Sequence, residues 1–246
     1  AWILISKFFD HLPFYRQQQI FKRMGVVIAE STINGWFTAA CRLLVPLYEA
    51  LRAKVLLSSY LMSDETPLRV LTRDKPGTTH RGFHWAYCAP VERLALFDYQ
   101  KSRSREGPQQ LLTSFQGHLQ TDGYEVYNYF ENQSGITLLA CMAHARRYFD
   151  KAKDNDPQRA KAALEMFQKL YAIESIAREE KLQPDQIRIL RQEKAVPVLQ
   201  EMEAWLKKNA YEVLPKSAIG KAIAYTLNLW PRLLRYVEDG RFHIDN

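Results

Sequence analysis

The sequence predicts an α/β fold in which a sheet-forming middle region lies between two helical regions. The spacing of hydrophobic residues changes from helical to strand-like near residue 59 and becomes helical again near residue 150. In the middle region, three successive strands precede a short helix, a fourth strand, and a fifth strand that leads into a basic helix. This order is typical of α/β proteins. We therefore divide the chain into residues 1–58, 59–150 and 151–246.

The composition is that of a basic globular protein. The chain has 246 residues, of which 47% are hydrophobic and 12% aromatic, enough for a buried core. Its net charge of +7 and pI near 9.2 fit a nucleic-acid partner, and also fit a merely basic protein. Three widely spaced cysteines favour a reducing cytoplasm, and no apolar run approaches the roughly 20 residues of a membrane span.

Residues 1–58 are predicted to be helical. Residues 14–24 carry apolar side chains at helical spacing, and Gly25 suits the position after a helix. Ser31 suits the cap of a second helix over residues 31–44, with Ile33, Trp36, Phe37 and Ala40 on one face. Such a pair is the outline of a helix-turn-helix, whose second helix enters the DNA major groove. It is also the outline of an ordinary helical hairpin, which the pattern alone favours.

The middle region is predicted to contain five strands. The first begins at Tyr60 and runs into a turn at Pro67, because proline cannot donate to a strand ladder. The other strands are predicted at residues 83–90, 94–100, 118–122 and 136–144, with a loop over 75–82, a short helix over 107–117 and a basic helix over 145–152.

The last region is helical and rich in charge. Mixed charges on the outer faces of such helices are typical of solvated surfaces. The predicted helices cover residues 158–181, 184–195, 198–214 after Pro197, and 216–240 with an interruption at Pro231.

Asp64 and Asp122 are the carboxylates best placed for chemistry. Each lies at or just past the end of an apolar strand, where α/β sheets tend to place functional groups. Two such aspartates can share Mg²⁺ ions, because hard cations prefer carboxylate oxygens. Two metals roughly 4 Å apart can then activate the attacking oxygen and stabilise the leaving oxygen of a phosphodiester. The alternative is that both are turn residues, since Asp-Gly is a common turn pair.

Basic residues near these aspartates suit contacts with DNA phosphates. Arg103 and Arg105 lie on a predicted loop, and Arg146 and Arg147 open the basic helix. His144 could contact a phosphate or position a carboxylate, and a structural histidine is the alternative. Cys141 and His144 could form half of a zinc site, but no second pair with suitable spacing accompanies them. The sequence has no glycine-rich phosphate loop and no Gly-x-Ser-x-Gly elbow.

Six blocks, in order along nearly the whole chain, resemble the transposases of the IS66 family. They are KFFDHLPFYRQQQIF, SDETPLRVL, LQTDGYEVYN, CMAHARRYFDKA, LYAIE and WPRLLRYVEDGRFHIDN. The resemblance implies a DDE transposase with a ribonuclease H-like core, a mixed five-stranded sheet with helices. In that core the first aspartate lies on the first strand and the second on or after the fourth. By resemblance, Asp64 and Asp122 are the first two acidic residues and bind Mg²⁺ or Mn²⁺.

The resemblance also implies a reaction and its partners. Such an enzyme hydrolyses a phosphodiester at the end of the element, and the freed 3′-hydroxyl then attacks target DNA. The expected partners are double-stranded DNA and further copies of the chain, since such transposases act as multimers. Residues from about 151 to 225 would be a helical insertion, and a helix-turn-helix within residues 14–40 becomes the favoured interpretation.

The third acidic residue is where the sequence departs from the family pattern. In this family the Ile-Asp-Asn block continues to a Glu-Arg pair whose glutamate completes the triad, and this sequence stops at Asn246. Glu238 and Asp239 precede that motif, and Asp245 is a neighbour of the site. We expect both ends to be cuts through a longer reading frame. The chain is then expected to be a partial, inactive copy, with a non-catalytic DNA-binding remnant or regulator as the alternative.

Overall fold

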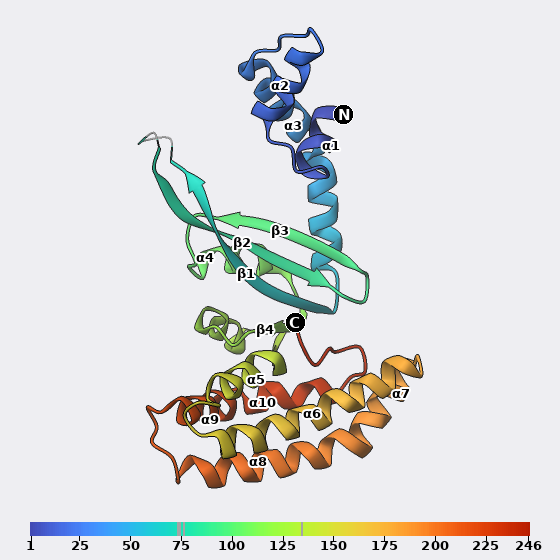
Figure 1. Ribbon diagram of the computed structural model, residues 1–246. Coiled ribbons are helices and arrows are strands. Elements are labelled where there is room, and N and C mark those ends of the chain that lie inside the picture. Colours follow the sequence, from blue (N-terminus) through green and yellow to red (C-terminus); the bar gives the residue numbers. More distant parts are fainter. Residues whose placement is uncertain (73–74, 76, 134) are drawn as a thin grey trace. The chain divides into compact units, whose positions relative to one another are not determined.

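The computed structural model describes residues 1–72, 75, 77–133 and 135–246 (Figure 1). Within this part the chain forms two compact units, Ala1–Lys54 and Val55–Asn246. The divisions at 58/59 and 150/151 stay predictions. Of the loop predicted over residues 75–82, residue 76 lies outside the described residues, and residues 79–82 instead begin a strand, Thr79–Ala89, so that part of the prediction is wrong. No helix in the described ranges is long and apolar enough to cross a membrane.

The first unit consists of three helices. They are α1 (Trp2–Phe8), α2 (Phe14–Arg23) and α3 (Glu30–Leu56), the last of which extends beyond the unit. The buried Gln17 joins the first two, because its side-chain amide donates to the carbonyls of Ile3 (3.2 Å) and Leu12 (2.9 Å). Two helices joined by a short segment over residues 24–29 are present as predicted.

The third helix differs from its prediction in length and in one face. It continues through Pro46 to Leu56, about three turns beyond the predicted end at residue 44. Ile33 is buried, but Trp36, predicted on the same apolar face, is 53% exposed. Leu43 and Leu47 are exposed as well, so the apolar stripe of α3 is only partly covered within its unit.

The second unit contains a mixed five-stranded sheet in the order β3-β2-β1-β4-β5. β1 is central: it pairs antiparallel with β2 and parallel with β4, and β4 pairs parallel with β5. This confirms the predicted α/β class with a mixed sheet. The strands are β1 (Tyr60–Leu71), β2 (Thr79–Ala89), β3 (Leu94–Gln100), β4 (Gly117–Thr121) and β5 (Ile136–Ala140).

The turn predicted at Pro67 is wrong, because β1 continues through that residue to Leu71. Pro67 lies opposite Phe83 of β2, while the pairing of β1 with β4 ends at Met62. Beyond Met62 the second side of β1 has no partner strand in the described part, so β1 is an edge strand there. An edge position tolerates proline, whose missing N–H removes no bond from the ladder.

Short helices cover one face of the sheet. On this face Trp85 of β2 meets Tyr127 edge-on at a centroid distance of 6.1 Å, and the hydroxyls of Ser63 and Tyr127 lie 2.8 Å apart. The helices are α4 (Glu106–Leu111), η1 (Leu112–Ser114) and η2 (Glu125–Asn132). The predicted helix over 107–117 therefore ends earlier, and β4 begins at Gly117.

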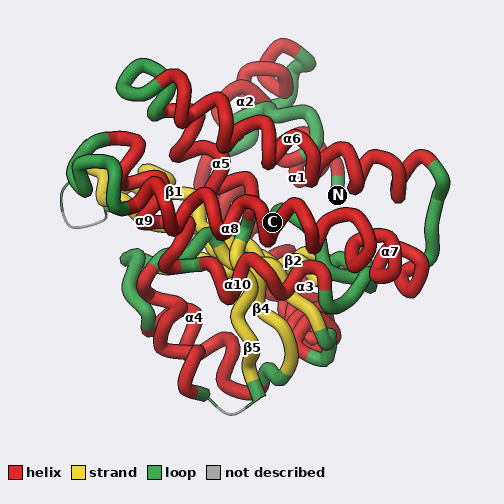
Figure 2. Tube along the Cα trace, turned by 90° about the horizontal axis from the view of Figure 1, so that it is seen from below, coloured by secondary structure: helices red, strands yellow, loops and turns green. Residues whose placement is uncertain are grey.

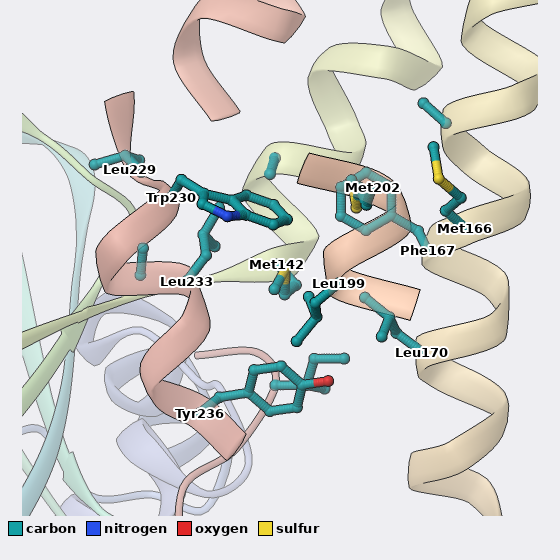
Figure 3. Packing of buried hydrophobic residues seen from close by; sticks show 14 of the residues in the cluster. Met142, Met166, Phe167, Leu170, Leu199, Met202, Leu229, Trp230, Leu233 and Tyr236 are labelled. Atoms are coloured by element: carbon teal, nitrogen blue, oxygen red, sulfur yellow. The ribbon is translucent and has the colours of Figure 1, made fainter. Parts of the chain in front are cut away.

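The remaining helices form a layer beside β4 and β5 (Figures 1 and 2). Their buried side chains make one hydrophobic cluster that also includes Tyr60 of β1 and Leu139 of β5 (Figure 3). Residues from the middle and last regions of the sequence therefore share a core. The helices are α5 (Met142–Lys151), α6 (Pro157–Glu179), α7 (Pro184–Leu190), α8 (Val196–Ala210), α9 (Ala218–Asn228) and α10 (Trp230–Leu234), with the short η4 (Arg235–Val237).

The helix break predicted at Pro197 is wrong. α7 and α8 are joined by a π-helical turn, Arg191–Ala195, so helical backbone continues past Pro197. A proline ring clashes with the carbonyl four residues earlier in a regular α-helix, and the wider π turn immediately before it relieves that clash. The π turn also holds the buried Arg191, which pairs with Glu174 of α6 at 2.7 Å.

The fifth strand is shorter than predicted and the basic helix begins earlier. β5 ends at Ala140 and α5 starts at Met142. Distant residues supply the reason: Ile244 accepts a hydrogen bond from the backbone N–H of Met142 (3.0 Å), and the Asp245 carboxylate accepts one from Ala143 (2.7 Å). These acceptors satisfy the free N–H groups of the first helical turn.

Candidate active site

Asp64 lies on β1, and Asp122 directly follows β4, the parallel strand beside β1. The register between the two strands ends with the pair Met62 and Gln120, and each aspartate follows two residues later. Neighbouring strands are about 4.8 Å apart, so both aspartates lie near the point where this pairing stops. Asp64 is exposed and Asp122 is half-buried, with a side chain 19% exposed.

The turn after β4 holds Asp122 firmly. Gly123 has a φ of +83°, and a Cβ at that position would lie 2.4 Å from Leu229 Cδ1. The Tyr225 hydroxyl of α9 donates to the Asp122 carbonyl, and the Tyr124 backbone N–H donates to the Asp122 carboxylate at 2.8 Å. Asp122 is therefore fixed by a helix that lies 103 residues away in the sequence.

Tyr225 is itself held in place. Tyr148 of α5 stacks on its ring at a centroid distance of 4.3 Å and an angle of 24°. Burial and the nearby Asp122 carboxylate raise the pKa of the Tyr225 hydroxyl above its ordinary value, so it remains a hydrogen-bond donor at neutral pH.

A third carboxylate, Glu65, lies beside this pair and is neutralised by Arg103. Consecutive strand residues point to opposite faces, so Glu65 lies on the face away from Asp64. Arg103 donates through Nε to Glu65 Oε1 at 2.5 Å, and its Nη2 also pairs with that oxygen. The same Nη2 lies 4.0 Å from Asp122. Burial raises the pKa of the Glu65 carboxyl, and the bond from Arg103 opposes that rise.

Residues 242–246 run to the same place. The His243 carbonyl accepts from the side-chain amide of Gln120 (3.0 Å), and Asp245 accepts from the Tyr171 hydroxyl (2.8 Å). The Asn246 side-chain amide donates to the carbonyl of Ser63 (3.1 Å), next to Asp64. The Ile-Asp-Asn block thus lies against β1 at the candidate site.

Of the basic residues predicted to contact DNA, only Arg103 pairs with an acidic residue of the site. Arg105 is exposed on the same loop, and both line a groove of about 610 Å³ together with Tyr124 and Tyr129. In the described part of the chain, no hydrogen bond or ion pair joins these residues of α5 to Asp64 or Asp122. Those residues are His144, Arg146 and Arg147.

These residues of α5 differ in exposure and in their contacts. Arg146 and Arg147 are exposed, and Arg146 lines a groove of about 930 Å³ with Lys153 and Lys161. His144 is half-buried, and its Nδ1 is buried without a hydrogen-bond partner among the described residues. Whether they bind DNA stays a prediction.

The carboxylate oxygens of the site are suitable ligands for a divalent cation, although they do not converge on one point. No group of three or more His, Cys, Asp or Glu side chains within the described ranges is arranged to hold a metal ion. Asp64 and Asp122 offer hard carboxylate oxygens. On the other face of β1 the second oxygen of Glu65, Oε2, is buried without a partner in the same ranges. Such oxygens are the ligands that Mg²⁺ prefers.

Comparisons with known proteins identify the family. The family model described as "Transposase IS66 family" matches residues 1–246, the whole chain. The chain belongs to the IS66 transposase family. This confirms the resemblance stated from the sequence blocks.

Three relatives in Sinorhizobium fredii (strain NBRC 101917 / NGR234) resemble this IS66 family chain over its full length. Uncharacterized protein y4jD is 32% identical over 260 residues, and 50% of its own length is covered. Uncharacterized proteins y4hP and y4qI are 29% and 28% identical, each with 48% of its length covered. The chain thus spans about half the length of the curated relatives it matches. No solved structure matches it.

Several residues of the site could not be selected from the sequence. Tyr225 and Tyr171 stand in helices whose patterns indicate only packing. Nothing local links Tyr225 to Asp122, 103 residues earlier, or Tyr171 to Asp245, 74 residues later. Glu65 was visible as the neighbour of Asp64, but its pairing with Arg103 depends on the loop after β3.

Proposed function

We propose that this chain carries the first two acidic residues of a DDE transposase site, which cleaves DNA at the ends of an insertion sequence and transfers the strand. The position of Asp64 on β1 and of Asp122 directly after β4, the parallel strand beside β1, within a chain of the IS66 family, carries this proposal. The activity of the whole protein, its Mg²⁺ dependence and its DNA partners are all part of the proposal.

The strand order supports a ribonuclease H-like core. Three antiparallel strands followed by two parallel ones, with the first strand central, is the arrangement expected of such a core. Asp64 lies on the first strand and Asp122 directly after the fourth, the two positions that the resemblance implies.

Asp64 and Asp122 would hold Mg²⁺ or Mn²⁺, which would polarise the phosphodiester and stabilise the charge that develops on its oxygens. The task of the surrounding residues is to fix these carboxylates. Tyr225 and Gly123 hold the Asp122 turn, and Asn246 binds the carbonyl of Ser63. Basic side chains along the two grooves would hold the DNA backbone: Arg103 and Arg105 on one, Arg146 and its neighbour Arg147 near the other.

A glutamate beyond the Ile-Asp-Asn block would complete the acidic set in a longer form of the chain. The block already lies against β1 one residue from Asp64, so a following segment would start at the site. Residues 1–246 supply two of the three acids that the family pattern requires. We therefore expect this polypeptide alone neither to cleave nor to join DNA carrying insertion-sequence ends.

The test is Mn²⁺ binding by the 246-residue chain, measured by the loss of free-ion signal in electron paramagnetic resonance. Asp64→Asn and Asp122→Asn should each weaken binding by tenfold or more, since each removes a charged ligand. Asp154→Asn, an exposed aspartate after α5, is the matched control and should bind as the unaltered chain does. Equal affinity in all four proteins would refute the metal site.

A second candidate function is DNA binding without catalysis. The absence of three converging ligands within the described ranges favours it. The helix pair α2–α3 would then contact DNA as a helix-turn-helix. Retention of duplex DNA on a gel, lost as salt rises, together with no Mn²⁺ binding, would select this candidate over the first.

A further inference from the structure

Glu65 is a buried acidic residue that has no role in the proposed site of Asp64 and Asp122. Its side chain is 1% exposed, and one of its two carboxylate oxygens, Oε2, is buried without a hydrogen-bond partner in the described part of the chain. Leaving such a group unsatisfied is costly, so native structures seldom do so without a functional reason. The orphan oxygen therefore indicates a missing ligand.

Arg103 is the cation that now neutralises this region. Its guanidinium bonds to Glu65 Oε1 and lies 4.0 Å from Asp122 Oδ2, between the two carboxylates. The ring of Tyr124 lies under the guanidinium at 3.8 Å, and the Tyr124 hydroxyl donates to the Arg103 carbonyl at 3.2 Å. The guanidinium of Arg103 thus holds a fixed positive charge between Glu65 and Asp122.

The two sides of this contact differ in solvent exposure and in how their backbone is held. Glu65 belongs to a paired strand, opposite Trp85, and Asp122 is fixed by the turn after β4. Arg103 stands on the exposed loop between β3 and α4, and its side chain is 42% exposed. The guanidinium of Arg103 therefore has a path to solvent, whereas both carboxylates are attached to backbone that is held by hydrogen bonds.

We propose that Glu65 and Asp122 form an additional divalent-cation site, and that Arg103 is an internal counter-cation which the metal ion must displace. This rests on the proposed function, in which Asp122 also serves the pair with Asp64. A metal ion and a guanidinium compete for the same oxygens, because both need negative charge at short range. The displaced Arg103 keeps its planar array of donors, which suits a phosphate of the DNA strand.

Mn²⁺ titration of the unaltered chain and three variants tests the displacement. Arg103→Gln should tighten Mn²⁺ binding about tenfold, which is the low end of the coupling measured between close charge pairs at a protein interface. Lys101→Gln, at an exposed lysine on the same loop, should leave the affinity unchanged. Glu65→Gln should remove the gain when combined with Arg103→Gln. An unchanged or weaker affinity in Arg103→Gln, or an equal gain in the double variant, overturns the proposal.

Arg103→Gln leaves Glu65 buried without its cation, so its folding must be followed separately. Thermal unfolding with and without Mn²⁺ does this, because an ion that binds the folded state raises the Tm. We expect Mn²⁺ to raise the Tm of Arg103→Gln more than that of the unaltered chain. A variant that Mn²⁺ cannot stabilise at any concentration overturns the proposal.

The outcome also separates this inference from the proposed function. Loss of Mn²⁺ binding in Asp64→Asn with no effect of Arg103→Gln leaves the proposed function standing and overturns the counter-cation. Absence of Mn²⁺ binding in every variant overturns both.

Discussion

Replacing Arg191 with methionine would remove the main polar connection between the π turn and the end of the chain. Its guanidinium makes two hydrogen bonds to the Glu174 carboxylate, at 2.8 and 2.7 Å. It also donates to the carbonyls of Tyr236 (2.8 Å) and Asp239 (3.1 Å), just before the segment that reaches the candidate site. The Arg191 side chain is 3% exposed and that of Glu174 is 11% exposed, so water cannot replace these bonds easily.

The size of the effect follows from that burial. Breaking a buried ion pair by removing one partner costs about 3–5 kcal/mol, because the other charge is left unpaired. A domain is stable by only about 5–15 kcal/mol, so Arg191→Met should lose a large share of the free energy of unfolding. Adding Glu174→Leu removes the stranded charge. The double variant should therefore recover at least about 2 kcal/mol of that loss, while two carbonyls remain without their donor.

Urea unfolding, followed by circular dichroism and tryptophan fluorescence, measures both variants. Lys169→Met on α6, whose contact with Glu201 at 3.4 Å is exposed, is the matched control and should change stability by less than about 1 kcal/mol. The reasoning is refuted if Arg191→Met behaves like this control, or if the double variant is as unstable as the single one.

Three further predictions concern the turn, the pH response and DNA. Gly123→Ala should lower the free energy of unfolding by about 1–3 kcal/mol or more, and by more than Gly25→Ala, which has a similar φ of +82° but no atom within 4 Å. Burial lowers the pKa of His118 and His243 below the ordinary 6.5. As pH falls through about 6.5, the unfolded chain therefore binds more protons than the folded chain, and the free energy of unfolding should drop from about pH 7 to pH 5. The drop should be smaller in His118→Asn, and an unchanged pH dependence in that variant would count against the assignment. Arg146→Ala should reduce the slope of log Kd against log salt for duplex DNA by about 1, whereas Lys216→Ala in the loop before α9 should not.

Local patterns predicted the elements of the second unit well. The strand over Leu94–Gln100 agrees at both ends, and Asp122 directly follows β4 as predicted. Asp64 was predicted at a strand end, and this is wrong, because β1 continues beyond it to Leu71. Strand periodicity and Asp-Gly turn chemistry are local properties, which is why they were sufficient. The family resemblance added a chemical role that periodicity alone left open.

The errors arose where distant contacts override local preference. Pro67 is tolerated because β4 stops early and leaves β1 at an edge, which no property of the residues around Pro67 reveals. Pro197 is accommodated by a π turn that also places Arg191 against Glu174. The start of α5 is set by Ile244 and Asp245, more than a hundred residues later. Tyr225 belongs to the same class, since its bond to Asp122 depends on the packing of α9.

The central claim is that a divalent ion binds at Asp64 and Asp122. Fe²⁺ can be substituted for Mg²⁺ and, with ascorbate and peroxide, generates radicals that cut the polypeptide next to the bound ion. Sequencing of the fragments then locates the site directly. The account predicts cuts close to residues 64 and 122, suppressed by excess Mg²⁺ and absent in Asp64→Asn. Cuts confined to other parts of the chain, or cuts at these positions that persist in Asp64→Asn, would contradict it.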